Sequence, residues 1–202
     1  MSDFDDLVIE LAPPPNRMGM CEGERERHLY ESAVMLAYAM HLLRTELITE
    51  VCIYPDGEHG KQFDFSGWLG RREFSKNWSS GKTSYGGTYT DGEGRTIIIN
   101  PKSGQGDVVA KIGNQIVSAE CKGGIINTRH SGEVSRLDKG LCEAVGRLMA
   151  TKPPVPDRQV AVVPYTATTC ELAKRLASRC ARVGIKLALV KGDGQVIDVQ
   201  GE

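Results

Sequence analysis

The chain has 202 residues, a length typical of one domain. Its 25 lysine and arginine residues balance 26 aspartate and glutamate residues, and the net charge of −1 excludes a strongly basic nucleic-acid-coating protein and an acidic disordered tail. With 40% hydrophobic and 25% charged residues, the composition is that of a globular protein, not of a collagen or a coiled coil. No apolar run approaches the roughly 18 residues of a membrane span, and the N-terminus has no basic and apolar leader. We therefore expect a cytoplasmic protein with no membrane partner.

The charge is distributed unevenly along the chain. Residues 1–95 hold 10 basic and 16 acidic side chains, whereas residues 96–202 hold 15 and 10. The C-terminal half could therefore face phosphate although the whole chain is not basic. The six cysteines lie far apart and form no C-x-x-C pair, which argues against a structural zinc site and predicts reduced thiols.

The N-terminal part of the chain predicts an arm, a helix and a strand. Residues 1–23 are acidic and then proline-rich, so we expect a poorly packed arm before a single domain over 24–202. Apolar residues at helical spacing predict a helix over about 24–44 that is buried on more than one face. The stretch 47–54 reads as the first strand.

An unusual segment follows this strand, over about 55–95. It holds nine glycines and seven of the twelve aromatic residues, and its length predicts a hairpin-bearing insertion or a functional flap. Arg71, Arg72 and Lys76 alternate there with aromatic residues, a mixture that suits stacking and phosphate contact with nucleic acid. The alternative is an aromatic cluster that packs the insertion onto the body of the domain.

The rest of the chain alternates strands and helices. We expect helices over 137–150 and 167–183, separated by prolines and a strand at 159–163. Further strands are predicted over the ranges 96–100, 107–112, 115–122, 185–190 and 195–199. The sequence thus predicts an α/β fold with a mixed central sheet flanked by helices.

The most informative stretch is the hairpin predicted around Gly113 and Asn114. A two-residue turn at these positions places Ile112 opposite Gln115, and the same register places Asp107 opposite Glu120. Lys122 projects to the same face as Glu120, because side chains alternate along a strand.

Two opposed carboxylates would destabilise a ladder unless a cation neutralised them. Asp107 and Glu120 offer the hard oxygen ligands that Mg²⁺ prefers, with Mn²⁺ as a substitute, and Lys122 could hold an attacking water or stabilise developing charge. The alternative for this pattern is a solvent-facing hairpin with cross-strand ion pairs.

The acid at 107, the spacing of twelve residues and the triplet Glu120-Cys121-Lys122 resemble the Asp…Glu-x-Lys signature of the PD-(D/E)xK nuclease superfamily. Gly106 stands where that family usually has a proline. The expected order of elements over about 24–190 is similar to the superfamily's core. The resemblance implies a restriction-endonuclease-like core with an insertion after the first strand, and a Mg²⁺-dependent nuclease that hydrolyses phosphodiester bonds of nucleic acid. Of the two candidate substrates, DNA is favoured and RNA is the alternative.

The resemblance also implies roles for individual residues. Asp107, Glu120 and the main-chain carbonyl of Cys121 would bind the metal, and Lys122 would position or activate the water. Many members add a glutamate from the first helix, for which Glu31 is favoured by spacing and Glu26 is the alternative. The Cys121 side chain points away from this face and is expected to pack as a small hydrophobe.

The remaining expectations concern partners. Lys139 and Arg147 share a polar helix face with Glu143, which suits either solvent or phosphate. No sequence-reading domain or motor motif is visible, so we expect a homo-oligomer or a subunit of a defence or repair complex, such as one with an ATPase. The alternative to a nuclease is a catalytically silent module of the same fold that binds nucleic acid or protein.

Overall fold

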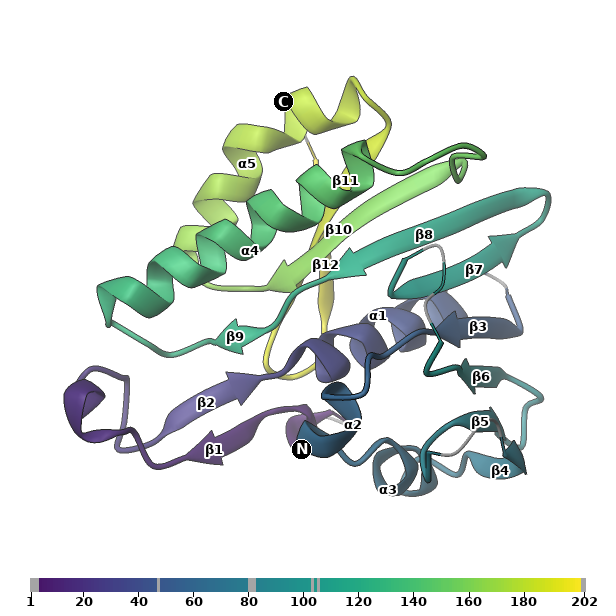
Figure 1. The fold of residues 1–202 in the computed structure, drawn as a ribbon, viewed down its shortest axis with the longest axis horizontal. Helices are drawn as coiled ribbons and strands as arrows, with labels where there is room; N and C mark the ends of the chain where they lie inside the picture. Colours follow the sequence, from purple (N-terminus) through teal and green to yellow (C-terminus); the bar gives the residue numbers. More distant parts are fainter. Residues whose placement is uncertain (1–3, 47, 80–82, 103, 105, 201–202) are drawn as a thin grey trace.

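The chain, seen here in a computed structural model, is built around one mixed sheet of nine strands (Figure 1). The structure describes residues 4–46, 48–79, 83–102, 104 and 106–200. Across the sheet, the strands are β12 (Val196–Val199), β11 (Ile185–Val190), β10 (Arg158–Pro164), β8 (Gln115–Cys121), β7 (Val108–Ile112), β3 (Glu50–Ile53), β6 (Thr96–Ile99), β5 (Gly87–Thr90) and β4 (Ser75–Ser79). β10 is parallel to β8 and β11, β3 is parallel to β6, and the other neighbours are antiparallel.

Helices cover both faces of this sheet. Because side chains alternate along β10, Val160 and Val162 pack in the core that contains α1 (Glu31–Thr45), whereas Ala161 and Val163 pack in the core under α4 (Ser131–Met149) and α5 (Ala167–Ala181). α1 is buried on nearly all sides, and α4 buries a single stripe that includes Leu141. The predicted α/β class with a mixed central sheet flanked by helices is confirmed.

The first predicted helix begins later than expected. Glu26–Leu29 forms strand β2, which pairs with β1 (Ile9–Leu11) and β9 (Gly124–Ile125) in a second, three-stranded sheet. The sequence prediction of a helix from residue 24 was wrong because pairing with β1 and with β9, which lies about a hundred residues away, overrides the local helical pattern.

The two ends of the N-terminal segment are packed against the domain, so the prediction of a poorly packed arm over 1–23 was wrong for Phe4, Leu7 and Cys21, whereas no side chain between residues 8 and 20 is buried. Phe4, which precedes the short turn η1 (Asp5–Leu7), and Leu7, its last residue, are buried. A second turn, η2 (Pro15–Arg17), ends on Arg17, whose guanidinium contacts the buried carboxylates of Glu26 at 2.6 Å and Glu133 at 3.0 Å. These contacts fasten the small sheet to the start of α4.

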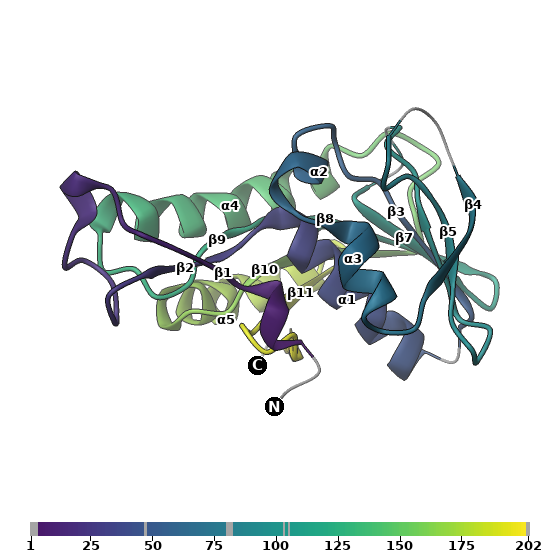
Figure 2. The same ribbon diagram turned by 90° about the horizontal axis from the view of Figure 1, so that it is seen from below.

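The insertion after β3 contains α2 (His59–Gln62), α3 (Phe65–Gly70) and the strands β4 and β5, which extend the main sheet. Figure 2 shows α2 and α3 beside α1, on the same side of β4 and β5. The expected hairpin is therefore present. Six of its seven aromatic side chains are buried and Trp78 is 64% exposed. The interpretation as a surface for stacking was wrong for the six buried side chains, which hold the insertion on the body of the domain, and it stays a prediction for Trp78.

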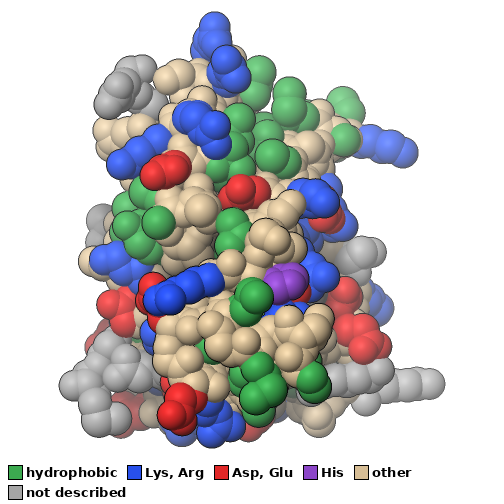
Figure 3. Space-filling model, turned by 90° about the vertical axis from the view of Figure 1, so that its left-hand side faces the viewer, with side chains coloured by type: hydrophobic (Ala, Val, Ile, Leu, Met, Phe, Trp, Pro, Cys, Tyr) green, Lys and Arg blue, Asp and Glu red, His purple; other side chains and the backbone are tan. Residues whose placement is uncertain are grey.

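The other elements lie close to their predicted ranges, except that α4 begins at Ser131 and not at 137. All six cysteines are free thiols. Basic, acidic and apolar side chains are interspersed on the end of the molecule seen in Figure 3. Among the helices of the described residues, none is both long and apolar enough to cross a membrane.

Candidate functional site

The β7–β8 hairpin has the predicted register. Ile112 pairs with Gln115 across the two-residue turn, where Gly113 has a φ of +60°, and Val108 pairs with Ala119. Asp107 lies one residue before β7, and its backbone N–H donates to the Ala119 carbonyl at 2.8 Å. Its carboxylate Oδ2 accepts a hydrogen bond of 2.7 Å from the Cys121 backbone N–H. Asp107 is thereby held against the end of the strand that carries Glu120.

The backbone conformation at position 106 requires glycine and could not be adopted by the proline of the nuclease pattern. The φ of +131° at Gly106 is outside the range that a proline ring allows, and a Cβ at this position would lie 2.3 Å from Ser118 Oγ. The glycine thus lets the chain pass close to β8 immediately before Asp107.

Glu120 is the most perturbed carboxylate of the hairpin. Burial, followed by the charge of Asp107, raises its pKa from 4.5 to about 7, although Arg147 and Lys122 act in the opposite direction. Its Oε2 atom is buried without a hydrogen-bond partner among the described residues, and Arg147 Nη1 lies 3.8 Å away. An ionised carboxylate in such a position lacks a full counter-charge.

Lys122 lies beside Glu31, the first residue of α1. Its Nζ atom is 3.2 Å from both carboxylate oxygens of Glu31 and 3.9 Å from Oε1 of Glu143. Burial raises the pKa of Glu31 and the charge of Lys122 lowers it, with a net rise. The structure therefore brings Glu31 to the site. Glu26 does not belong to the site, because it lies on β2 and its side chain pairs with Arg17.

The approach of α1 to Lys122 depends on Gly123. A Cβ on this residue would lie 2.4 Å from the Glu31 backbone nitrogen and 2.7 Å from the Leu29 carbonyl oxygen. On the opposite side, a Cβ on Gly140 of α4 would lie 3.3 Å from the Lys122 Cβ. Two glycines therefore allow backbone segments to close around the lysine.

Asp107 and Glu120 open into a pocket of about 370 Å³. Its other described lining residues are Glu31, Tyr54, Pro55, Asp56, Gly57, Pro101, Gly104, Gly106 and Arg147. Asp56 is an additional carboxylate that sequence reasoning missed, because it follows β3 in the insertion and has no informative spacing to the hairpin. Its charge contributes to the raised pKa of Glu31.

The remaining predicted residues fall into three groups. Cys121 is fully buried in the core on the α1 side, as expected for an inert thiol, and burial raises its pKa. On α4, Arg147 reaches the pocket, with Nη2 2.7 Å from Glu143 Oε1, whereas Lys139 is exposed and is not among the described lining residues.

The basic residues predicted to bind nucleic acid in the insertion, Arg71, Arg72 and Lys76, are not among the described residues that line this pocket. Arg71 and Arg72 both pair with Asp6, and Lys76 Nζ donates to the Ser84 carbonyl at 2.7 Å. Their contact with nucleic acid stays a prediction. It would require these side chains to bind phosphate in addition to, or in place of, their present protein partners.

The donor set of Asp107 and Glu120 fits a small divalent cation. Mg²⁺ typically uses one or two protein carboxylates and completes its shell with water and substrate oxygens. The buried Oε2 of Glu120 is an acceptor of the kind that a cation would satisfy. No group of three or more histidine, cysteine, aspartate or glutamate side chains in the described ranges is arranged to hold a metal, so any ion would depend on these two carboxylates and non-side-chain ligands.

Comparisons with known protein families, with curated proteins and with solved structures found no match for this chain.

Proposed function

We propose that this chain is a metal-dependent nuclease of the PD-(D/E)xK superfamily, with a restriction-endonuclease-like core, and that it hydrolyses phosphodiester bonds of DNA. The observation that carries the proposal is the state of Glu120. Its carboxylate is buried beside that of Asp107, with a pKa of about 7 and one oxygen without a hydrogen bond in the described part of the chain. A fold keeps such a pair at a cost in stability, and binding a cation supplies a reason for it.

Different residues of the chain would bind the metal ion, orient the attacking water and contact the phosphate. Asp107 and Glu120 would hold Mg²⁺ or Mn²⁺, with the Cys121 main-chain carbonyl as a further ligand. The bound ion would supply Lewis-acid polarisation of the phosphate and a lowered pKa of water. Lys122 is positioned by Glu31 to orient the attacking water or to stabilise charge on the phosphate. Arg147 lines the pocket and would contact a phosphate oxygen of the substrate.

The charge distribution bears on how the substrate is held. The net charge of −1 provides no strong basic field, so non-specific affinity for DNA should be weak and sensitive to salt. We propose that the remaining affinity for DNA comes from a homo-oligomer or from a larger cytoplasmic complex, such as a defence or repair assembly with an ATPase.

A nuclease assay with purified protein tests the proposal. We expect cleavage of linear, circular, single-stranded or branched DNA in Mg²⁺, none in EDTA, and at least a hundredfold loss for Asp107→Asn and Lys122→Ala. Glu171→Gln and Lys174→Ala, which alter exposed side chains of α5, are the matched controls and should keep full activity. Equal activity in all variants would reject the assignment.

Titration of the same proteins with Mn²⁺ separates the nuclease from the catalytically silent module. A nuclease should bind the ion through Asp107 and Glu120, whereas a silent module should give no heat that depends on either residue. An inactive protein with no such binding would favour the silent module.

A further inference from the structure

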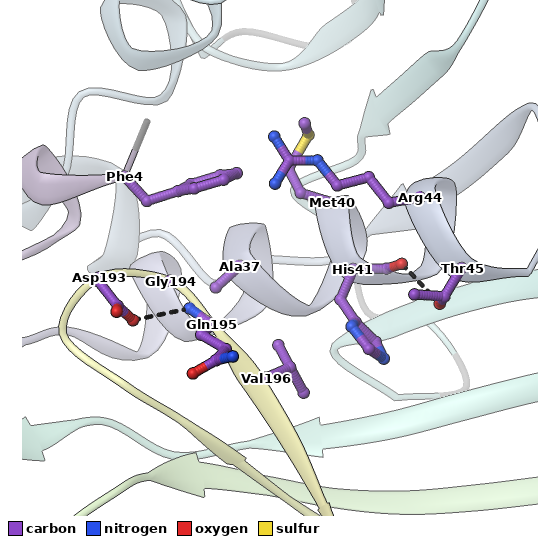
Figure 4. Close-up of a pocket in the computed structure, with 10 residues that line it drawn as sticks. All are labelled: Phe4, Ala37, Met40, His41, Arg44, Thr45, Asp193, Gly194, Gln195 and Val196. Carbon is purple, nitrogen blue, oxygen red and sulfur yellow. Dashed lines mark hydrogen bonds between the residues drawn. The ribbon is translucent and has the colours of Figure 1, made fainter. Parts of the chain in front are cut away.

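A second pocket, of about 380 Å³, lies near the opposite end of α1 from Glu31. Since an α-helix rises 1.5 Å per residue, Arg44 lies about 20 Å along the helix from Glu31, so the pocket is separate from the candidate metal centre. Three segments contribute arginines to it: Arg44 on α1, Arg71 and Arg72 at the end of α3, and Arg95 before β6. An adjoining hollow of about 400 Å³ shares Met40 and Arg44 with it (Figure 4).

Aromatic rings fix two of these arginines. The guanidinium carbon of Arg72 lies 3.7 Å from the centroid of the Trp68 ring, and that of Arg44 lies 4.4 Å from the centroid of the Phe4 ring. Figure 4 shows Phe4 and Arg44 extending toward each other above the adjoining hollow. Stacking restrains a guanidinium plane while its N–H edges stay able to donate, which is the geometry that binds phosphate oxygens.

A carboxylate of the chain itself already lies between two of the arginines. Asp6 Oδ2 accepts from Arg71 Nε at 3.0 Å, and Asp6 Oδ1 accepts from Arg72 Nη2 at 2.5 Å. Burial opposes the ionisation of Asp6, but the hydrogen bonds and charges of Arg72 and Arg71 outweigh it and lower its pKa. The Arg71 side chain is 57% exposed and that of Arg72 is 13% exposed, so an oxyanion from solvent can reach Arg71 directly and would approach Arg72 by displacing the Asp6 carboxylate.

Backbone strain occurs at the same place. Glu73, which also lines the pocket, has a φ of +64° and is the one residue other than glycine with a positive φ in the described chain. This left-handed conformation is unfavourable for a residue with a side chain, and here it ends α3, where the Phe74 N–H donates to the Leu69 carbonyl at 3.1 Å. The strained turn directly follows Arg71 and Arg72.

From these observations we propose that the arginine pocket binds the phosphate group of a phosphorylated small molecule, in competition with the Asp6 carboxylate. The two hollows have the size of small-molecule sites, which favours a compact ligand over a duplex. Met40 forms an apolar part of both, and His41 and Gln195 offer polar groups to the remainder of the ligand. A nucleoside phosphate and an inorganic polyphosphate share the chemistry that the arginines recognise.

Calorimetric titration of the full chain in EDTA tests this proposal without involving the metal centre or nuclease activity. The probes are tripolyphosphate, ATP, adenosine and a 12-base-pair DNA duplex. We expect tripolyphosphate to bind, and Arg44→Gln and Arg71→Gln each to weaken it about tenfold. Asp6→Asn should tighten it severalfold, because the competing charge is lost. Arg175→Gln, on the exposed face of α5, is the control and should change binding less than twofold.

The remaining outcomes decide the ligand. Tighter binding of ATP than of tripolyphosphate would identify a nucleoside phosphate, and equal binding would identify the phosphate chain alone. The proposal fails if neither the wild type nor Asp6→Asn binds tripolyphosphate, or if binding is indifferent to Arg44 and Arg71. It also fails if the duplex binds more tightly than both phosphates with the same arginine dependence. Because Asp6→Asn predicts a gain, loss of binding through misfolding cannot imitate the expected result.

Discussion

Lys122 Nζ lies 3.2 Å from both carboxylate oxygens of Glu31, although the two residues are 91 positions apart in the chain. Both side chains are largely buried, with 14% and 21% of their surface exposed. The contact joins the end of β8 to the start of α1. It therefore links the stability of the fold to the position of the proposed catalytic lysine.

We expect this pair to be energetically coupled. At pH 8, Lys122→Met should destabilise the protein more when Glu31 is present than when it is Gln, because a buried carboxylate then loses its partner. A double-mutant cycle in urea should give a coupling of about 1–2 kcal/mol. The control is the exposed pair Glu22 and Arg129, 3.9 Å apart and away from the pocket, which should give no more than about 0.5 kcal/mol. Equal couplings in the two cycles would contradict the structural role of the buried pair.

Gly123 should be intolerant of a single methyl group. A Cβ there would meet backbone atoms of Leu29 and Glu31, which cannot rotate away as a side chain can. Gly123→Ala should cost about 1–3 kcal/mol in unfolding free energy and should reduce the proposed nuclease activity by displacing Glu31 from Lys122. Gly146→Ala on α4, where a Cβ meets nothing within 4 Å, should instead stabilise the protein by about 0.5–1 kcal/mol. Similar unfolding curves for the two variants would show that the close approach is not rigid.

The parts of the site that local pattern determines could be predicted from the sequence. The turn at Gly113 and Asn114 fixes the register, and the register places Asp107 next to Glu120. Asp56 could not be found in this way, because the long insertion after β3 and not a spacing brings it to the pocket. Alternating aromatic and basic residues can stack on nucleic-acid bases, or they can pack on one another inside the protein, as Arg72 does on the buried Trp68 ring. The sequence pattern alone does not distinguish these two arrangements.

Glu120 should lower the stability of the protein at alkaline pH. Its pKa of about 7 in the folded protein exceeds the ordinary value of 4.5, so the folded state binds more protons than the unfolded chain between these limits. The protonated side chain is compatible with burial, and stability is lost as the pH rises through about 7. Glu120→Gln should therefore raise the melting temperature at pH 8 by at least about 2 °C and leave it nearly unchanged at pH 5. The exposed control Glu171→Gln should show no such pH dependence, and a uniform shift at both pH values would contradict the raised pKa.

The affinity for a metal ion should increase with pH, whereas stability decreases, because both depend on the ionisation of Glu120. A cation needs the ionised carboxylate, and burial together with the charge of Asp107 keeps Glu120 largely protonated below about pH 7. The apparent affinity for Mn²⁺ should rise by up to about tenfold per pH unit between pH 5.5 and 7 and level off by pH 8. Calorimetric titration at four pH values measures this, with Glu120→Gln expected to bind weakly and with a flatter profile. A wild-type affinity that is constant from pH 5.5 and unchanged by Glu120→Gln would show that Glu120 is not a metal ligand.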